Sequence, residues 1–245
     1  DDDRAMNNIC RFSSLSTRYQ YGLTLIEIMV ALVLSLFLIA GVIQLFLGSK
    51  QTYRFHDALS RIQENGRFAI NAMAADIRMA DFGSPTPPAV SGADATTGSN
   101  ETDSINLAWV DGGNQTRNYA IVASAAVPAC ASAATSLSLN RNGGGAQELI
   151  EGVQAMQILY GVCADANGDN VIDGPPVNYV NATAVGAAWG LVCSVRIHLL
   201  LVSLENNIVT EPQAYFFPMS DTVSQTPTDR CLRQAFSTTV RIRNR

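Results

Sequence analysis

The stretch DANGDNVID, residues 165–173, carries oxygen-bearing side chains at a spacing that suits a metal ion. In calcium loops of the EF-hand type, side-chain oxygens occupy positions one, three, five and nine, and a backbone carbonyl serves at position seven. The corresponding residues of this chain are Asp165, Asn167, Asp169, Asp173 and, for the carbonyl, Val171. The pattern predicts a candidate calcium site in which Asp165 and Asp169 are the main carboxylate ligands.

Two departures from the calcium pattern leave a second interpretation open. Asn170 stands where the loop has a glycine, and Pro176 stands where it has a bidentate acid. The residues before the loop resemble a strand, whereas the loop of an EF-hand lies between helices. A polar turn rich in Asp, Asn and Gly between two strands explains the same residues.

The cysteines form an even set in the second part of the chain. They are Cys130, Cys163, Cys193 and Cys231. An even number of cysteines is compatible with two disulfides in an oxidising compartment, and four cysteines allow three pairings. A metal site is the weaker alternative, because no CxxC occurs.

The sequence argues against catalysis and against nucleic-acid binding. No nucleophile and base stand in a known motif such as GxSxG or HExxH, and there is no P-loop. The net charge is -5, and the arginines are scattered rather than clustered, so no basic stripe is available for a phosphate backbone. We therefore expect neither an enzyme nor a nucleic-acid partner.

The elements that carry these residues begin with a long apolar run. No charged residue occurs from Ile28 to Ser49, and a helix of that length spans about 33 Å, enough for a bilayer core of about 30 Å. We expect residues 23–49 to cross a membrane. No small-residue cleavage site follows the run, unlike in a secretory signal peptide.

Residues 1–22 read as a polar leader before that helix. Arg11 and Arg18 favour a cytoplasmic location for the leader and an outside location for the rest of the chain. Residues 1–5 precede Met6, which is the expected start of the protein.

An amphipathic continuation, residues 50–83, follows the apolar run. Its apolar positions recur at a spacing of three or four residues and predict a single helix from Thr24 to Ala80. The apolar stripe comprises Phe55, Leu59, Ile62, Gly66, Ala69, Ile70, Met73, Ile77 and Ala80. The helix is expected to end at DFGSP, where Gly83 and Pro85 interrupt it.

The remaining residues, 84–245, predict a β-rich domain. Residues 84–103 are rich in Pro, Ser, Thr and Gly and are expected to form a loop without packed structure of its own. Short apolar runs separated by turns such as DGGN and NGGG then predict antiparallel strands. The runs are SINLAWV, NYAIVAS, TSLSLN, VQAMQILYGV, SVRIHLLLVSL, QAYFFPM and STTVRIRN. RIHLLLV is expected to be central, with His198 as a sheet residue, and the whole is an α+β fold.

Several motifs resemble one known class of proteins. GLTLIE, from Gly22 to Glu27, resembles the class III signal of type IV pilins and pseudopilins, in which a glycine is followed by FTLIE; here Leu23 replaces the phenylalanine. QENGRF, EGVQAMQILYGV and FSTTVRIRNR resemble segments of the PilW-type minor pilins of type IV pili. The resemblance implies a pilin-like fold, with a long N-terminal helix packed on an antiparallel sheet.

The resemblance also implies roles for three residues of the signal. A prepilin peptidase is expected to cut between Gly22 and Leu23 and to methylate the new amine. The Glu27 carboxylate is expected to pair with a cationic N-terminal amine in the assembling filament. An acid in an apolar setting is costly unless it is paired, which agrees with that role. The alternative is that Glu27 reaches the membrane interface without a partner.

The family implies a structural subunit that primes type IV pilus assembly, in a tip complex, and supports twitching motility. Its implied partners are other minor pilins, the major pilin, the prepilin peptidase, the inner membrane and a tip adhesin. The chain would sit in the inner membrane before assembly and then in the pilus, with its globular domain periplasmic or extracellular. The alternative function is a J-type minor pseudopilin of a type II secretion system. Calcium is the one cofactor that the sequence suggests.

Overall fold

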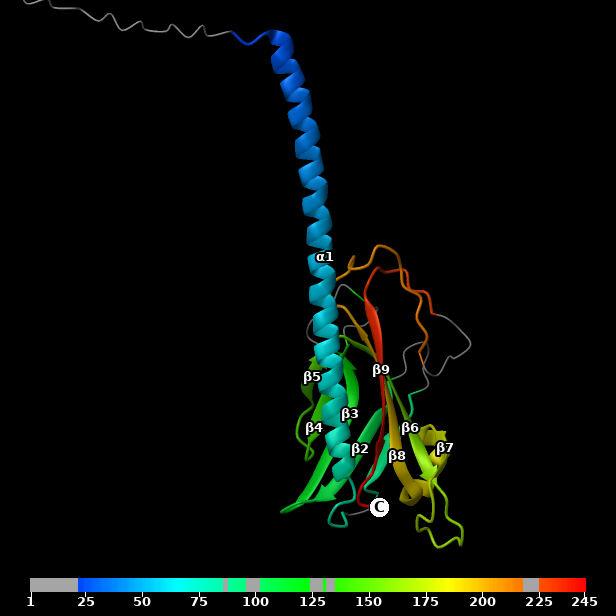
Figure 1. The fold of residues 1–245 in the computed structure, drawn as a ribbon. Helices are drawn as coiled ribbons and strands as arrows, with labels where there is room; N and C mark the ends of the chain where they lie inside the picture. Colours follow the sequence, from blue (N-terminus) through cyan, green and yellow to red (C-terminus); the bar gives the residue numbers. More distant parts are fainter. Residues whose placement is uncertain (1–21, 86–87, 96–101, 124–129, 131–134, 218–224) are drawn as a thin grey trace, which may run out of the picture. The chain divides into compact units, whose positions relative to one another are not determined.

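The fold is taken from a computed structural model that describes residues 22–85, 88–95, 102–123, 130, 135–217 and 225–245 (Figure 1). The chain divides into two compact units, residues 1–49 and residues 50–245. Helix α1 (Leu25–Met79) runs from the first unit into the second. The units are described separately below.

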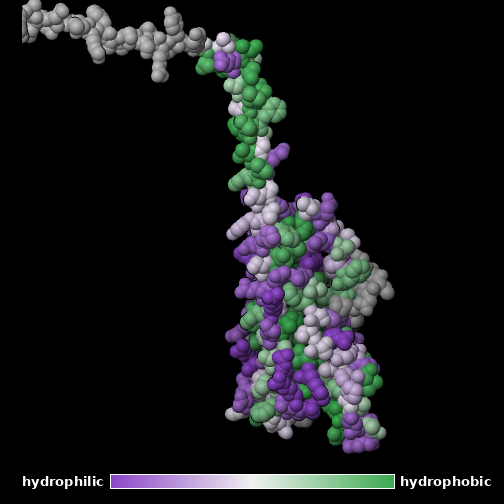
Figure 2. All heavy atoms as spheres, in the orientation of Figure 1, coloured by the Kyte–Doolittle hydropathy of each residue, from purple (hydrophilic) through white to green (hydrophobic). Residues whose placement is uncertain are grey.

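The described part of the first unit is helical and apolar. The helix begins at Leu25. The hydroxyl of the preceding Thr24 accepts a hydrogen bond from the amide of Glu27 at 3.3 Å, as helix-capping residues do. Every side chain from residue 22 to residue 49 is exposed, and apolar side chains cover the visible face of this helical part (Figure 2). Its apolar stretch has a mean hydropathy of 2.7 and is long enough to cross a membrane. The predicted apolar helix is confirmed.

In the second unit, one face of α1 is buried against the β-sheets. The buried residues are Ile62, Gly66, Ala69, Met73, Ala74 and Ile77. Phe55, Leu59 and Ile70 pack against the same core while remaining partly exposed. These positions reproduce the predicted spacing of three and four residues, because that spacing places side chains on one side of a helix.

Two antiparallel sheets complete the second unit (Figure 1). The first has the order β1-β2-β3-β4-β5 and the second the order β7-β6-β8-β9. The strands of the first sheet are β1 (Val90–Ala93), β2 (Ser104–Val110), β3 (Asn114–Ala123), β4 (Thr135–Arg141) and β5 (Gln147–Glu151). Those of the second are β6 (Val153–Cys163), β7 (Pro176–Val180), β8 (Val192–Val202) and β9 (Arg233–Arg241).

The α+β prediction is confirmed, and β8, which contains RIHLLLV, lies between β6 and β9 as expected. Three strands, β1, β5 and β7, and two short helices, α2 (Ala182–Val185) and the 3-10 helix η1 (Ala188–Leu191), were not predicted.

Two sequence expectations for the β domain are wrong. Residues 84–103 are not without packed structure, because β1 forms within them and Val90 is fully buried. The run QAYFFPM does not form a strand in its described part: Tyr215 makes only an isolated bridge to Gln225. Pro212 precedes the run and Pro218 lies within it, and proline cannot donate to a β-ladder.

Polar contacts fix the end of α1 to the sheets and to the last residues of the chain. The hydroxyl of Tyr119 donates to the Asp76 carboxylate at 2.7 Å, and burial of Tyr119 raises its pKa, so the phenol keeps its proton. The Asn244 amide donates to the carbonyls of Arg78, Met79 and Ala80 at 3.1–3.3 Å. These carbonyls at the helix end have no partners inside the helix, so Asn244 caps them.

Asp103 joins the two sheets. Its carboxylate accepts hydrogen bonds from the amides of Ile158 in β6 at 2.8 Å and of Ala95 at 3.2 Å. Its own amide donates to the carbonyl of Met156 at 3.1 Å. Burial raises the pKa of Asp103 from 3.8 to about 6 despite the two hydrogen bonds, and repulsion from Asp94 adds to the rise.

The NGRF segment provides a first prediction. A side chain at Gly66 would overlap the ring of Phe236 in β9, so glycine permits the close approach of helix and strand. Gly66→Val should lower the free energy of unfolding by about 1–3 kcal/mol through overpacking, measured by denaturant unfolding of the full chain in detergent. Adding Phe236→Leu should restore part of the loss. Gly145→Val, where nothing lies within 4 Å of the added Cβ, is the matched control, and an equal loss there contradicts the prediction.

Asp103 provides a second prediction, on pH. Its pKa is higher in the folded chain than in the unfolded chain, so the folded state binds the proton more tightly and is stabilised as the pH falls through about 6 towards 3.8. Since one pKa unit corresponds to about 1.4 kcal/mol and about one unit of the shift lies between about pH 6 and about pH 5, the free energy of unfolding should rise by about 1.3 kcal/mol between about pH 7 and about pH 5. Asp229, whose pKa is lowered by Arg233, acts only at lower pH.

Asp103→Asn should remove this rise, whereas Asp111→Asn, at an exposed position, should keep it. Thermal unfolding of the full chain in detergent at several pH values measures both. A pH profile that is the same in Asp103→Asn and in the unchanged chain contradicts the assignment.

Candidate functional site

The three residues of the predicted signal lie together at the start of α1. Gly22 and Leu23 precede the helix, and Leu23 is exposed. Glu27 lies in the first turn. Among the residues that the structure describes, the Glu27 carboxylate has no hydrogen bond and no ion pair. A carboxylate beside apolar side chains is stable when a cation neutralises it, and none of the described residues supplies such a cation to Glu27.

The helix after Glu27 presents a large apolar surface. Its exposed members include Ile28, Met29, Val30, Leu32, Val33, Leu34, Leu36, Phe37, Leu38, Ile39, Val42, Ile43, Leu45, Phe46 and Leu47. Soluble monomers rarely expose contiguous apolar patches larger than a few hundred Å². A helix that is apolar on all sides is buried in lipid or among other helices, so this segment requires one of these surroundings.

The candidate calcium residues lie in one exposed loop between β6 and β7. The Asp165 carboxylate accepts hydrogen bonds from the amides of Gly168 at 2.7 Å and Asn170 at 3.0 Å. The Asp169 carboxylate accepts one from the amide of Val171 at 2.8 Å and one from the Asn167 side chain at 3.0 Å.

The Asp173 carboxylate accepts a hydrogen bond from the amide of Ala166 at 2.9 Å. Within the described ranges, no group of three or more His, Cys, Asp or Glu side chains is arranged to hold a metal ion. The hydrogen bonds are those of a polar turn that bonds to its own backbone. Calcium binding by Asp165, Asn167, Asp169, Val171 and Asp173 stays a prediction.

The four predicted disulfide cysteines form two bonds. Cys130 is joined to Cys231 and Cys163 to Cys193. The first pair is buried beside Val202. The second joins the end of β6 to the start of β8. Because Cys163 is the last residue of β6, the bond fixes the point at which the Asp-rich loop begins. The sequence could not choose among the three pairings, since the spacing of the cysteines does not reveal strand register.

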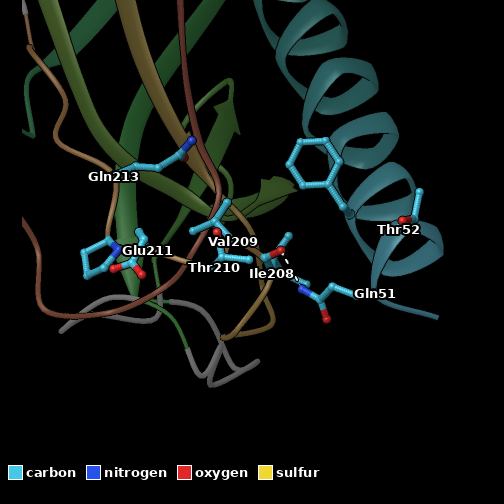
Figure 3. Close-up of a pocket in the computed structure, with 9 residues that line it drawn as sticks. Gln51, Thr52, Ile208, Val209, Thr210, Glu211 and Gln213 are labelled. Atoms are coloured by element: carbon cyan, nitrogen blue, oxygen red, sulfur yellow. Dashed lines mark hydrogen bonds between the residues drawn. The ribbon is translucent and has the colours of Figure 1, made fainter. Parts of the chain in front are cut away.

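The first turns of α1 in the second unit are attached to the loop after β8. The Gln51 amide donates to the carbonyls of Asn207 at 3.0 Å and Ile208 at 2.8 Å, and Arg54 pairs with Glu205 at 2.9 Å. A hollow of about 480 Å³ lies beside these contacts (Figure 3). Its lining mixes apolar and polar groups without a concentration of titratable side chains, so it suggests no particular ligand.

Comparisons with known proteins agree with the motifs at both ends of the chain. The family model described as type IV pilus-assembly protein W matches residues 118–244, more than half of the 245-residue chain. The model of the prokaryotic N-terminal methylation motif matches residues 17–43. A comparison with curated proteins finds no match. Among solved structures, the chain is similar to a type IV-like pilin from Thermus thermophilus, with 13% identity, a TM-score of 0.44, and coverage of 75% of this chain and 96% of that one.

The Asp-rich loop gives a direct test of calcium binding. If calcium binds there, millimolar calcium should raise the Tm of the full chain in detergent, because a ligand that binds only the folded state stabilises it. A calcium concentration of about 100 times Kd corresponds to about 2.7 kcal/mol. Asp165→Ala should abolish the shift, and Asp111→Ala, outside the loop, should keep it. The absence of a calcium-dependent shift in the unchanged chain removes the site and leaves the polar turn.

Proposed function

The chain belongs to the type IV pilus-assembly protein W family, and we propose that it acts as a minor pilin that primes pilus assembly in a complex at the tip. The observation that carries this proposal is the combination at the N-terminus. A methylation motif covers residues 17–43, the helix from Ile28 to Leu47 is apolar on all sides, and Glu27 has no partner in the described chain. A plain membrane anchor needs neither the motif nor the carboxylate.

The proposed mechanism begins with processing in the inner membrane. The prepilin peptidase cuts between Gly22 and Leu23, and the amine of Leu23 is methylated. Methylation keeps the positive charge of an amine, so the processed chain carries a cation at residue 23 and an anion at residue 27. The cation of one subunit can then pair with the Glu27 of a neighbour when the helix leaves the lipid and packs among other helices.

Pairing matters because the surroundings are apolar. A charge that is left without its partner in such surroundings costs about 3–5 kcal/mol. A subunit that enters the filament with its charges paired is therefore strongly favoured over one in which they are unpaired. In this way Glu27 selects the axial position of each helix relative to its neighbour.

The second unit supplies the proposed partner contacts outside the membrane. It lies in the periplasm before assembly and in the pilus afterwards, where it contacts other minor pilins, the major pilin and a tip adhesin. Twitching motility depends on it because extension requires a primed filament. The two disulfides support this location, since disulfides persist in oxidising compartments.

The alternative is a J-type minor pseudopilin of a type II secretion system. The signal from Gly22 to Glu27 serves both kinds of assembly. The match of residues 118–244 to the pilus-assembly family favours the pilus. Deletion of the gene separates the two functions: loss of surface pili with normal secretion supports the minor pilin, and loss of secretion with normal pili supports the pseudopilin.

Glu27 gives the sharpest test of the proposed mechanism. Glu27→Gln keeps the size of the side chain and removes its charge. The number of surface pili should fall by roughly 100-fold, because about 3 kcal/mol of lost pairing corresponds to that factor. The measurement is a count of pili by electron microscopy in cells that carry the variant as their only copy.

Glu64→Gln, an exposed position on the same helix, is the matched control and should leave the count unchanged. Mass spectrometry should find Leu23 at the N-terminus of both variants, which shows that processing is intact. Normal piliation in Glu27→Gln contradicts charge pairing. Normal piliation after deletion of the whole gene contradicts the priming role itself.

A further inference from the structure

Four residues of the second sheet form a row on the face turned away from α1. Cross-strand register places Tyr179 of β7 opposite Gly161 of β6, Gly161 opposite Ser194 of β8, and Ser194 opposite Arg241 of β9. Residues that are directly opposite one another in neighbouring strands point to the same face of a sheet. The row therefore places an aromatic ring and a guanidinium group on either side of a glycine and a serine.

A hollow of about 250 Å³ lies over this row. Tyr179, Ser194, Thr239 and Arg241 line it, and the disulfide of Cys163 and Cys193 forms part of the same lining. A Cβ at Gly161 would overlap the Ser194 hydroxyl and would lie 3.0 Å from the Tyr179 ring. The absence of a side chain at Gly161 thus permits the close approach of these two groups.

Arg196 holds two parts of the lining in position. Its guanidinium lies over the Tyr179 ring, 3.9 Å from the ring centroid, and its Nε donates to the Thr239 hydroxyl at 3.3 Å. The Ser194 hydroxyl also donates to the Tyr179 hydroxyl at 3.2 Å. The ring and the hydroxyl groups are therefore fixed before any ligand binds, which lowers the entropic cost of binding.

The charge of the hollow is opposite to that of the chain. The chain carries a net charge of -5, yet no Asp or Glu is among the lining residues. The Arg241 side chain makes no hydrogen bond and no ion pair with the residues that the structure describes. A guanidinium with free donors beside hydroxyl groups is suited to a carboxylate, which it can bind through two parallel hydrogen bonds.

We propose that this hollow, named here the Arg241 pocket, binds a carboxylate side chain presented by a partner protein. Its volume of about 250 Å³ is smaller than the roughly 300–1,000 Å³ of typical small-molecule sites, so it takes one amino-acid side chain rather than a whole cofactor. The carboxylate lies against Arg241 and the Thr239 hydroxyl, and the methylene groups of the side chain lie against the Tyr179 ring. The inference that the partner is another pilus subunit rests on the proposed function. The inference that the pocket binds a carboxylate rests only on the residues that line it.

The first arm of the test measures the chemistry with the purified full chain in detergent. The probe is glutamate capped as N-acetyl-glutamate N-methylamide, and the glutamine analogue is the neutral comparison. Titration followed by NMR should show binding of the glutamate probe and at least about tenfold weaker binding of the glutamine probe, since charge-assisted hydrogen bonds are the stronger kind. Equal binding of the two probes, or no binding of the glutamate probe, overturns the proposal.

Substitutions then locate the binding. Arg241→Gln should weaken binding of the glutamate probe by at least about tenfold. Arg241→Lys should weaken binding less, because the positive charge remains while the paired donors of the guanidinium are lost. Arg243→Gln makes the same change of charge at an exposed position outside the lining and should leave binding unchanged. An equal loss in Arg243→Gln overturns the pocket. The Tm of each variant, expected to be unchanged, excludes unfolding as the cause.

The second arm identifies the partner in cells. If a pilus subunit presents the carboxylate, Arg241→Gln should reduce the number of surface pili and Arg243→Gln should not. Normal piliation in Arg241→Gln overturns the assignment to a pilus partner. This outcome differs from failure of the proposed function, because failure of that function leaves pili normal when the whole gene is deleted.

Discussion

The packing of one helical face against two sheets is the constraint on which the second unit depends. Ile62, Ala69, Met73 and Ile77 are almost fully buried in a core to which both sheets contribute. Without the helix, the apolar sides of both sheets that line this core would be exposed to water, which is unfavourable. The core needs a close approach of helix and strand, and Gly66 permits it beside Phe236. The polar contacts of Asp76 and Asn244 then fix where the helix ends.

The same helix must satisfy two surroundings, and its sequence changes where the surroundings change. Up to Ser49 its side chains are apolar on all sides and exposed, which suits lipid or other helices. Beyond Ser49, the side chains of Gln51 and Arg54 form hydrogen bonds with the loop after β8. From there on, only one face of the helix is apolar. A continuous helix needs no loop at this change, because every interior backbone group bonds within the helix in either medium.

Local pattern predicted the long helix and most strands, because helix and strand periods are written in neighbouring residues. The prediction from local pattern was wrong where the composition of a segment suggested a different structure from the one it forms. Val90 forms a strand among prolines and serines, and Tyr215 does not form one although its neighbours are aromatic. The Arg241 pocket lay beyond sequence reasoning, since Gly161, Ser194 and Arg241 become neighbours only through strand register. The disulfide pairing depends on the same register.

Two charges without partners in the described chain, Glu27 and Arg241, have unequal physical consequences. In the proposed assembly Glu27 is withdrawn from water, so its pairing is little screened by salt and strongly affects stability. Arg241 is exposed to solvent, and an ion pair there is screened over about 8–10 Å at physiological salt and contributes little to stability. In the proposed binding, its contribution is to choose between partners, because a complementary charge favours one docking arrangement and a like charge opposes another. In the proposed assembly, the apolar helix and Glu27 therefore govern whether the subunit is incorporated, and the proposed carboxylate binding at the Arg241 pocket governs which neighbour it accepts.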